Sequence, residues 1–151
     1  MPQSLAATYI HLVFATKERR PWFRDLALRT ELHRQLGAIS KNLECQPILT
    51  GGVEDHIHQL ASLGRTVTIA NWVKELKRVS NLWITGHGRE YGTFEWQGGY
   101  AAFSVSHSKL ALITNYIARQ EEHHRKTNFQ NELRNRLRKH EVEWDERYVW
   151  D

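Results

Sequence analysis

Hydrophobic positions along the chain follow two different spacings, which predicts a mixture of strands and helices. Residues 8–15 are rich in β-branched and aromatic side chains and predict a strand. Apolar residues then recur every three or four positions from 26 to 43, which predicts an amphipathic helix with Asp25 as its N-cap. Two further strands are expected at 47–50 and 56–63.

The same alternation continues in the middle of the chain. Thr68 is expected to cap a helix over 69–83, which Gly86 breaks, and residues 100–106 predict a fourth strand. The pair Gly51-Gly52 allows a bulge or bend in the second strand. The resulting order β-α-β-β-α-β is the ferredoxin-like pattern. We therefore predict an α+β fold with an antiparallel sheet.

The C-terminal part predicts a helical extension of this fold. Ser108 is expected to cap a helix that continues through Ile117, and Thr127 or Asn128 is expected to begin another. Residues 144–151 show no periodicity and are expected to be extended or irregular.

Composition places few limits on the function. The chain has 151 residues, of which 40% are hydrophobic and 25% charged, and we assign a single domain to residues 1–151. No apolar run approaches the ~20 residues that cross a bilayer, and no signal peptide opens the chain, so we expect a cytoplasmic protein without a membrane partner. Cys45 is the only cysteine, which excludes disulfides and cysteine-rich zinc sites within a monomer.

The net charge of +4 is unevenly distributed. Basic residues gather after the first strand and on the helix that follows the third, at Lys17, Arg19, Arg20, Lys74, Lys77 and Arg78. Phosphates pair with cations, and bases stack on aromatic rings such as the six tryptophans and five tyrosines of this chain. These six residues are the expected contacts to a nucleic-acid backbone, and solvated protein faces are the alternative.

Two histidines separated by one residue indicate half of a metal site. His56 and His58 lie in the predicted third strand, where alternate side chains point to the same face, while Ile57 points to the opposite layer. Two imidazole nitrogens facing one way are typical ligands of a divalent cation.

A tyrosine and a glutamine supply a second half-site. Tyr116 and Gln120 are four residues apart in the predicted extension, which makes them neighbours on one helix face. A phenol is a poor nucleophile near neutral pH, and a metal assists it by polarising the phosphate under attack. Gln120 would supply a third ligand one turn from the nucleophile. A plain amphipathic helix is the alternative.

Other polar residues near these motifs are open to simpler interpretations. We expect Asp55 to make the hairpin turn rather than orient His56, and His11 to be a packing residue. His123 and His124 either contact phosphate or support the metal shell, or they face solvent.

The segments that carry these motifs resemble the single-tyrosine HUH transposases of bacterial insertion sequences, the IS-two-hundred group, which includes REP-associated tyrosine transposases. The similarity covers essentially the whole chain. It rests on the His-apolar-His strand, the Tyr-x-x-x-Gln helix, and the segments Tyr9–Phe14, Lys17–Pro21, Trp96–Ser106, Gln120–His124 and Arg147–Trp150. Departures from the family pattern fall at Gln59, Leu82 and Ala101, and Leu82 puts one DNA contact in doubt.

The resemblance implies a metal-dependent transposase that acts on single-stranded DNA with hairpin ends. Tyr116 would attack a phosphodiester, release a 3′-hydroxyl and keep a 5′-phosphotyrosine, which the 3′-hydroxyl of another strand then resolves. His56, His58 and Gln120 would hold Mg²⁺ or Mn²⁺. It also implies a homodimer, with the tyrosine helix of one subunit set against the histidine strand of the other in composite active sites.

Three other functions remain open on the sequence. A non-enzymatic module that binds single-stranded nucleic acid would explain the charge and the aromatic residues. A phosphodiesterase with metal-bound water as nucleophile would tolerate loss of Tyr116. A domesticated relative would use the same chemistry on palindromic repeats of its host.

Overall fold

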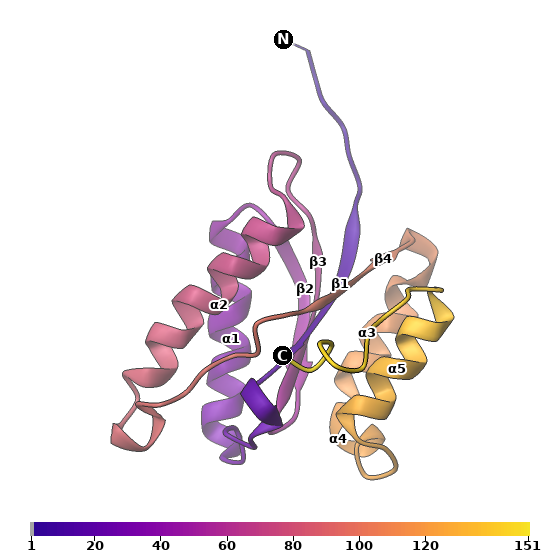
Figure 1. The fold of residues 1–151 in the computed structure, drawn as a ribbon. Helices are drawn as coiled ribbons and strands as arrows, with labels where there is room; N and C mark the ends of the chain where they lie inside the picture. Colours follow the sequence, from indigo (N-terminus) through magenta and orange to yellow (C-terminus); the bar gives the residue numbers. More distant parts are fainter. Residues whose placement is uncertain (1) are drawn as a thin grey trace.

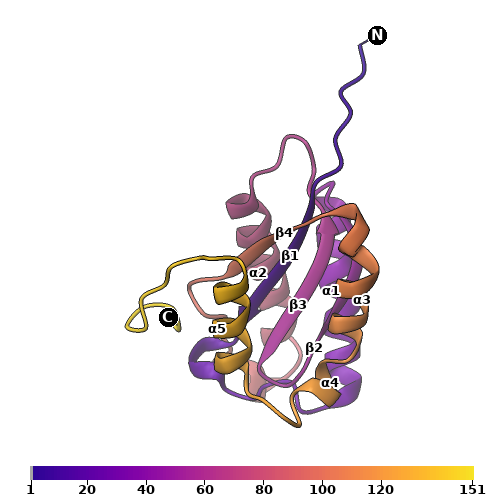
Figure 2. The ribbon, with the colours of Figure 1, turned by 90° about the vertical axis from the view of Figure 1, so that its right-hand side faces the viewer.

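The computed structural model describes residues 2–151 and contains one sheet covered by helices on both faces (Figure 1). Helices α1 (Leu26–Asn42) and α2 (Ile69–Thr85) lie on one face of the sheet. Helices α3 (Leu110–Ala118) and α5 (Phe129–Lys139) lie on the other. Figure 2, turned by a quarter, shows α5 and α3 apart on this face, with β1 and β3 visible between them.

The sheet has the predicted ferredoxin-like topology. It consists of β1 (Tyr9–Ala15), β2 (Gln46–Gly52), β3 (His56–Ser62) and β4 (Ala101–Val105), in the spatial order β2-β3-β1-β4. Each neighbouring pair is antiparallel. Because β3 and β1 are central, both are paired along their lengths and shielded from solvent on both faces.

Side-chain alternation along β3 divides its residues between the two helical layers, as predicted. Ile57 packs with Leu12 and Phe14 in the core that lies between the sheet and helices α1 and α2. Leu60, with the parity of His56 and His58, packs instead against Ile113 and Ile117 of α3. Both histidines therefore face the layer of α3 and α5.

Helix capping follows the sequence at three of the expected positions. The Asp25 carboxylate accepts hydrogen bonds from the backbone N–H groups at the start of α1. The Thr68 hydroxyl caps α2, and the Asn128 side chain caps α5. Each cap satisfies backbone donors that have no partner within their own helix.

The start and the continuity of the tyrosine helix differ from the prediction. Ser108 does not cap it but lies within a 3₁₀ turn (His107–Lys109), and α3 begins after Lys109 without a side-chain cap. The helix also does not run through Gln120. Arg119 leaves helical geometry with φ −102° and ψ 22°, and a short separate helix, α4 (Gln120–His123), follows.

The break in the pairing of β2 lies at Pro47–Leu49 and not at Gly51-Gly52, where we expected it. The register with β3 shifts between Pro47 and Leu49, because proline has no N–H to donate to the ladder. Gly51 and Gly52 remain paired with β3, opposite His58 and Ile57. The glycine at position 51 has another role, which concerns the site below.

The irregular C-terminal segment returns to the body of the protein. Trp144, Val149 and Trp150 pack against the cluster that contains Phe129 and Leu133 of α5. The Asp151 carbonyl accepts a hydrogen bond of 2.9 Å from the Gly99 N–H, just before β4. Among the helices described here, none has both the length and the apolar character needed to cross a membrane.

Candidate active site

The two histidines of β3 are buried, and a neighbouring side chain contacts Nδ1 of each ring. Relative exposure is 0% for His56 and 1% for His58. Nδ1 of His56 lies 2.7 Å from the Asp55 carboxylate, and Nδ1 of His58 lies 2.8 Å from Nε2 of His11. Such contacts fix the ring orientation of metal-ligating histidines, in which the other ring nitrogen, here Nε2, is the ligand atom.

Two residues expected to be structural therefore touch the histidine pair. Asp55 binds the His56 ring as well as standing at the β2–β3 turn, and His11 stacks against His58 with ring centroids 5.1 Å apart. Burial lowers the pKa of His11 well below its usual range and keeps that ring neutral. A neutral His11 can accept the Nδ1–H of His58 through its own Nε2.

Gln120 reaches the histidines despite the break at Arg119. Its amide Oε1 lies 3.1 Å from Nε2 of His56, and the side chain is buried. The interruption redirects the chain into α4, so the contact comes from the loop geometry as well as from helical spacing. The structure thus brings together the three residues that the sequence predicts as ligands.

Tyr116 lies beside the same histidines in the same chain. Its ring is edge-on to those of His58 and His11, with centroids 5.8 Å and 6.1 Å away. The Arg136 guanidinium lies over the ring, 4.5 Å from its centroid. Burial raises the pKa of the phenol above its ordinary value, and the neighbouring Glu132 carboxylate raises it further, whereas Arg136 lowers it. The hydroxyl is therefore neutral at physiological pH.

A glycine allows the tyrosine helix to approach the sheet this closely. A Cβ atom at Gly51 would lie 2.8 Å from Cγ2 of Ile117 and 3.0 Å from its carbonyl oxygen. Both distances are shorter than van der Waals contact, so any larger residue at 51 would push α3 outward. Gly51 is paired with His58, and Ile117 follows Tyr116. This contact sets the distance between the two half-sites.

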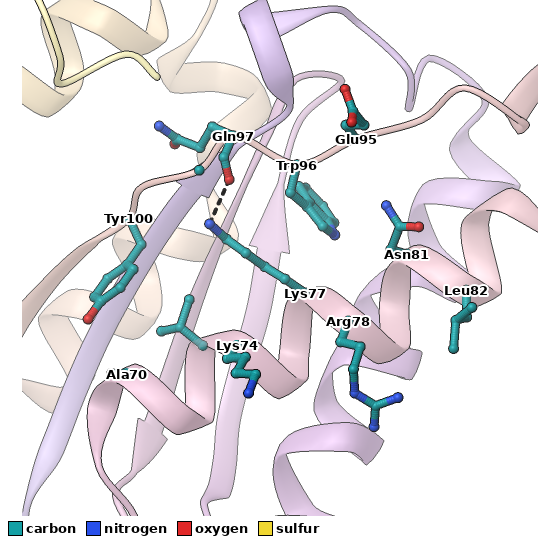
Figure 3. Close-up of a pocket in the computed structure, with 12 residues that line it drawn as sticks. Ala70, Lys74, Lys77, Arg78, Asn81, Leu82, Glu95, Trp96, Gln97 and Tyr100 are labelled. Carbon is teal, nitrogen blue, oxygen red and sulfur yellow. Dashed lines mark hydrogen bonds between the residues drawn. The ribbon is translucent and has the colours of Figure 1, made fainter.

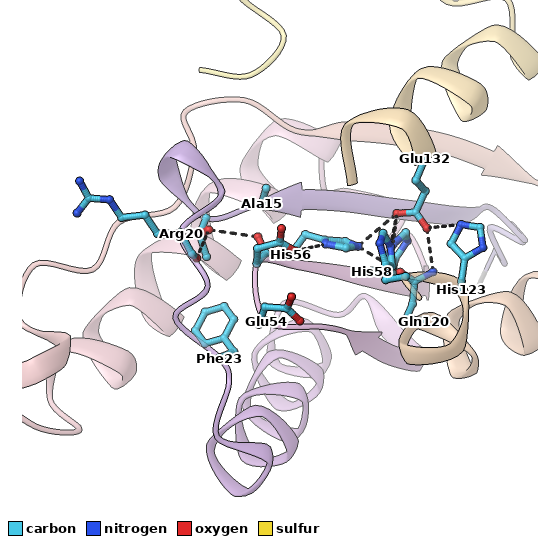
Figure 4. A network of polar contacts seen from close by, with 12 residues as sticks. Ala15, Arg20, Phe23, Glu54, His56, His58, Gln120, His123 and Glu132 are labelled. Atoms are coloured by element: carbon cyan, nitrogen blue, oxygen red, sulfur yellow. Dashed lines mark hydrogen bonds and ion pairs between the residues drawn. The ribbon is translucent and has the colours of Figure 1, made fainter. Parts of the chain in front are cut away.

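Glu132 lies at the centre of the site, and sequence reasoning missed it. Its carboxylate accepts a hydrogen bond from the Tyr116 hydroxyl. The same carboxylate lies 3.2 Å from Nε2 of both His56 and His58 (Figure 4). The signal in the sequence is its place on α5. Glu132 lies between Phe129 and Leu133 on the buried stripe of that helix, where an unpaired acid would be costly.

The histidine pair after Gln120 also faces this carboxylate. Nε2 of His123 and Nε2 of His124 each lie 3.3 Å from a Glu132 oxygen. His124 is the more buried of the two, and its Nδ1 lies 3.0 Å from the Thr127 carbonyl. The geometry favours a supporting role near the cation site over a solvent-facing pair.

The donor set suits a divalent cation of the first transition row or magnesium. His56, His58 and Glu132 offer ligand atoms that lie within 4.8 Å of one another. Burial alone would lower the pKa of both rings, and it brings that of His58 to about 4. At His56 the bonds to Asp55 and Glu132 outweigh burial and raise the pKa to about 9. Positive charge is therefore favoured at His56 and disfavoured at His58.

The basic residues on α2 border a cavity of about 680 Å³ rather than the histidine site (Figure 3). Lys74 is exposed at its edge, and Arg78 is paired with Glu75 at 2.7 Å. Lys77 is turned inward, and its ammonium donates to the carbonyls of Gln97 and Gly99 at 2.7 Å each. Burial lowers the pKa of Lys77 to about 8. Its ammonium thus holds the segment that precedes β4.

The basic turn after β1 is largely committed to contacts within the protein. Lys17 pairs with Glu95 at 3.1 Å, and Arg20 lies 3.3 Å from Glu18. The Arg19 guanidinium lies over the Trp150 ring, 5.7 Å from its centroid. The Lys17 and Arg20 pairs are exposed, so solvent screens them and phosphate can compete for these cations.

Comparison with known proteins agrees with the fold and the motifs. No curated protein matches the chain. Among solved structures, a chain provisionally named a transposase from Deinococcus radiodurans R1 is 23% identical with a TM-score of 0.60, over 80% of this chain and 96% of that one. A REP-associated tyrosine transposase bound to a REP hairpin is 11% identical with a TM-score of 0.59, over 82% of this chain and 72% of that one. The family model described as "Transposase IS200 like" matches residues 4–120, and the chain belongs to that family.

Proposed function

We propose that this transposase cleaves and rejoins single-stranded DNA through a 5′-phosphotyrosine on Tyr116, with a divalent cation held by His56, His58 and Gln120. The observation that carries the proposal is the meeting of one phenol with two oriented imidazoles on a single sheet face. A module that only binds nucleic acid would not explain why Tyr116 and the three proposed ligands lie together.

Each side chain has a distinct part in the reaction. The Tyr116 oxygen attacks the scissile phosphorus, the bond from phosphorus to O3′ breaks, and the departing oxygen takes up a proton to become a 3′-hydroxyl. The phenol gives up its own proton in the same step. Rejoining is the reverse reaction with a 3′-hydroxyl from another strand. The phosphodiester bond energy is kept in the enzyme intermediate, so neither ATP nor water is consumed.

The cation would be Mg²⁺ or Mn²⁺, and two imidazole ligands favour Mn²⁺. When bound, it would polarise the scissile phosphate and neutralise charge that develops during attack. The contacts of Asp55 and His11 with the two Nδ1 atoms would orient both Nε2 atoms for binding it. The raised pKa of the half-buried Tyr116 keeps its hydroxyl protonated in the free protein.

DNA would approach Tyr116 from the exposed side of α3. A cavity of about 360 Å³ opens beside the phenol, and its lining includes Asn115, Arg119, His123 and Lys126. The REP hairpin in the similar solved structure supports a hairpin as substrate. Lys17, Arg19, Arg20, Lys74 and Arg78 remain proposed phosphate contacts, whereas Lys77 is engaged by two carbonyls.

The test is a denaturing gel of protein mixed with a single-stranded oligonucleotide and Mn²⁺. The oligonucleotide should carry an imperfect palindrome from the DNA that flanks the gene. We expect a covalent adduct that withstands denaturation and disappears in Tyr116→Phe. Released product with full turnover by Tyr116→Phe would point to a water nucleophile, and binding without any adduct would point to a non-enzymatic module.

Palindromic repeats dispersed in the host genome are the second candidate substrate, because the similar solved structure holds a REP hairpin. The chemistry would be the same. Preferential cleavage of a dispersed-repeat hairpin over the flanking palindrome would favour this domesticated function.

A further inference from the structure

Glu132 comes from outside the part of the chain that matches the family, yet its carboxylate occupies the middle of the site. It lies on α5, beyond the matched residues 4–120. Its Oε1 lies 3.2 Å from Nε2 of His56, 3.2 Å from Nε2 of His58 and 3.3 Å from Nε2 of His124. Figure 4 shows the contacts of His56 and His58 converging on the one carboxylate.

The opposite ring nitrogens show how these imidazoles are protonated. Nδ1 of His56 faces the Asp55 carboxylate, and Nδ1 of His124 faces the Thr127 carbonyl. Both partners can only accept, so each Nδ1 must donate. In a neutral ring Nε2 is then a bare lone pair, and here it points at an anionic oxygen. A cation between these atoms would bind the ring nitrogens and the carboxylate oxygen together.

A divalent cation satisfies all of these contacts together, whereas one proton satisfies one ring. Adjacent ligand atoms of an octahedral shell lie about 3 Å apart, because the bonds to the metal are about 2.1 Å long. The separations here are 3.1 Å from Gln120 Oε1 to His56 Nε2 and 3.2 Å from Glu132 Oε1 to each ring of the pair. The spacing fits neighbouring corners of such a shell.

The second oxygen of the same carboxylate faces the nucleophile. Oε2 accepts the hydroxyl hydrogen of Tyr116 and a hydrogen bond of 3.1 Å from Nε2 of Gln120. Because a carboxylate is rigid and planar, an ion on Oε1 and a phenol on Oε2 are held at a fixed separation. Arg136, one turn further along α5, covers the face of the Tyr116 ring.

We propose that Glu132 is an additional, charged ligand of the divalent cation through Oε1 and positions the Tyr116 hydroxyl through Oε2. The proposal rests on the function proposed above. It assigns to the C-terminal helix a direct part in the active site, in addition to its packing against the sheet. A carboxylate also contributes negative charge that two imidazoles and an amide lack, which increases affinity for a hard cation such as Mg²⁺ or Mn²⁺.

The first test measures Mn²⁺ binding without DNA, by the electron paramagnetic resonance signal of free Mn²⁺. We expect Glu132→Gln, which keeps the shape of the side chain, to weaken binding by about tenfold or more. Glu143→Gln is the matched control, because it removes the same charge from an exposed residue of the C-terminal tail. Unchanged affinity in Glu132→Gln would overturn the ligand role.

The second test measures adduct formation at saturating Mn²⁺. If Oε2 positions the phenol, Glu132→Gln should remain slower than wild type by about tenfold or more even when its site is filled. Wild-type rates under saturation would overturn the positioning role. Should Glu132→Gln fail to fold by circular dichroism, Glu132→Asp replaces it, with the same losses expected. Failure of the proposed function differs from both results, since the wild type would then bind Mn²⁺ but form no adduct.

Discussion

Tyr116 lies edge-on to His58 of its own chain, with ring centroids 5.8 Å apart. The side chains that we propose as nucleophile and metal ligands are therefore all available within one chain. The resemblance to insertion-sequence transposases implies the other arrangement, in which helix and strand come from different subunits. The homodimer itself remains a prediction.

Mixed populations of two inactive variants distinguish these arrangements. Tyr116→Phe lacks the nucleophile and His56→Ala lacks a ligand, so subunits that exchange helices would assemble one intact site in a mixed dimer. Because one chain already brings these side chains together, we expect that mixing the two variants does not restore activity. We expect adduct yield in the mixture to equal the sum of the separate variants. Activity well above that sum would establish composite sites.

The contact between Gly51 and Ile117 predicts a variant that damages the site without touching its chemistry. Gly51→Ala places a methyl group 2.8 Å from Cγ2 of Ile117, so α3 must move away from β2. We expect a loss of about 1–3 kcal/mol in the free energy of unfolding. Adduct formation should fall further than stability explains, because Tyr116 moves with the helix.

Gly37→Ala is the control for that experiment. It lies within α1, where an added Cβ would stay 4.0 Å from its nearest neighbours. Alanine should raise the free energy of unfolding by up to about 1 kcal/mol, because glycine is the poorer helix former. Full activity of Gly51→Ala at a temperature where it is folded would contradict the role assigned to the glycine.

Much of this fold follows from local patterns in the sequence. The caps at Asp25, Thr68 and Asn128 act within one turn of their helices, so local chemistry determines them. The shared face of His56 and His58 follows from strand alternation alone. These features could be predicted because each depends on residues that are close in the chain.

The parts that escaped prediction depend on contacts between distant segments. Glu132 contacts His58, which is 74 residues away in the sequence. His11 also contacts His58, at a separation of 47 residues. The break at Arg119 comes between two stretches that each have helical character, so helical spacing alone did not show it. Only the packing of α5 against β1 and β4 brings the buried acid to the histidines of β3.

The ring contact between Asp55 and His56 predicts an effect on metal binding rather than on folding alone. Asp55→Asn keeps the size of the side chain but removes the charge that orients Nδ1 of His56 at 2.7 Å. Such partners typically contribute 10–100-fold to metal affinity. We expect Mn²⁺ affinity to fall within about that range, measured by titration of the free protein. Affinity equal to that of Glu143→Gln would show that Asp55 only makes the turn.

The two lysines of α2 should behave differently in DNA binding. Lys74 is exposed, so Lys74→Ala should reduce the slope of log affinity against log salt by about 0.7 for single-stranded DNA. Lys77 holds two carbonyls, so Lys77→Ala should lower thermal stability instead. Lys41→Ala, at an exposed position near the end of α1, is the control for a lost charge. An unchanged salt slope in Lys74→Ala would show that Lys74 does not contact the DNA phosphates.

His33 on α1 predicts a loss of stability in acid that is independent of the metal site. Burial, together with the smaller effect of the Arg29 charge, lowers its pKa to about 4. The unfolded chain, with an ordinary pKa near 6.5, therefore binds more protons between these values, so stability falls as the pH drops from about 6.5 towards 4. The full shift corresponds to about 3 kcal/mol. His33→Gln should lose less stability than wild type by up to about that amount, measured by urea unfolding with chelator at pH 7 and pH 4.5. Since the other titrating groups are common to both proteins, equal losses would mean that His33 is solvated in the folded state.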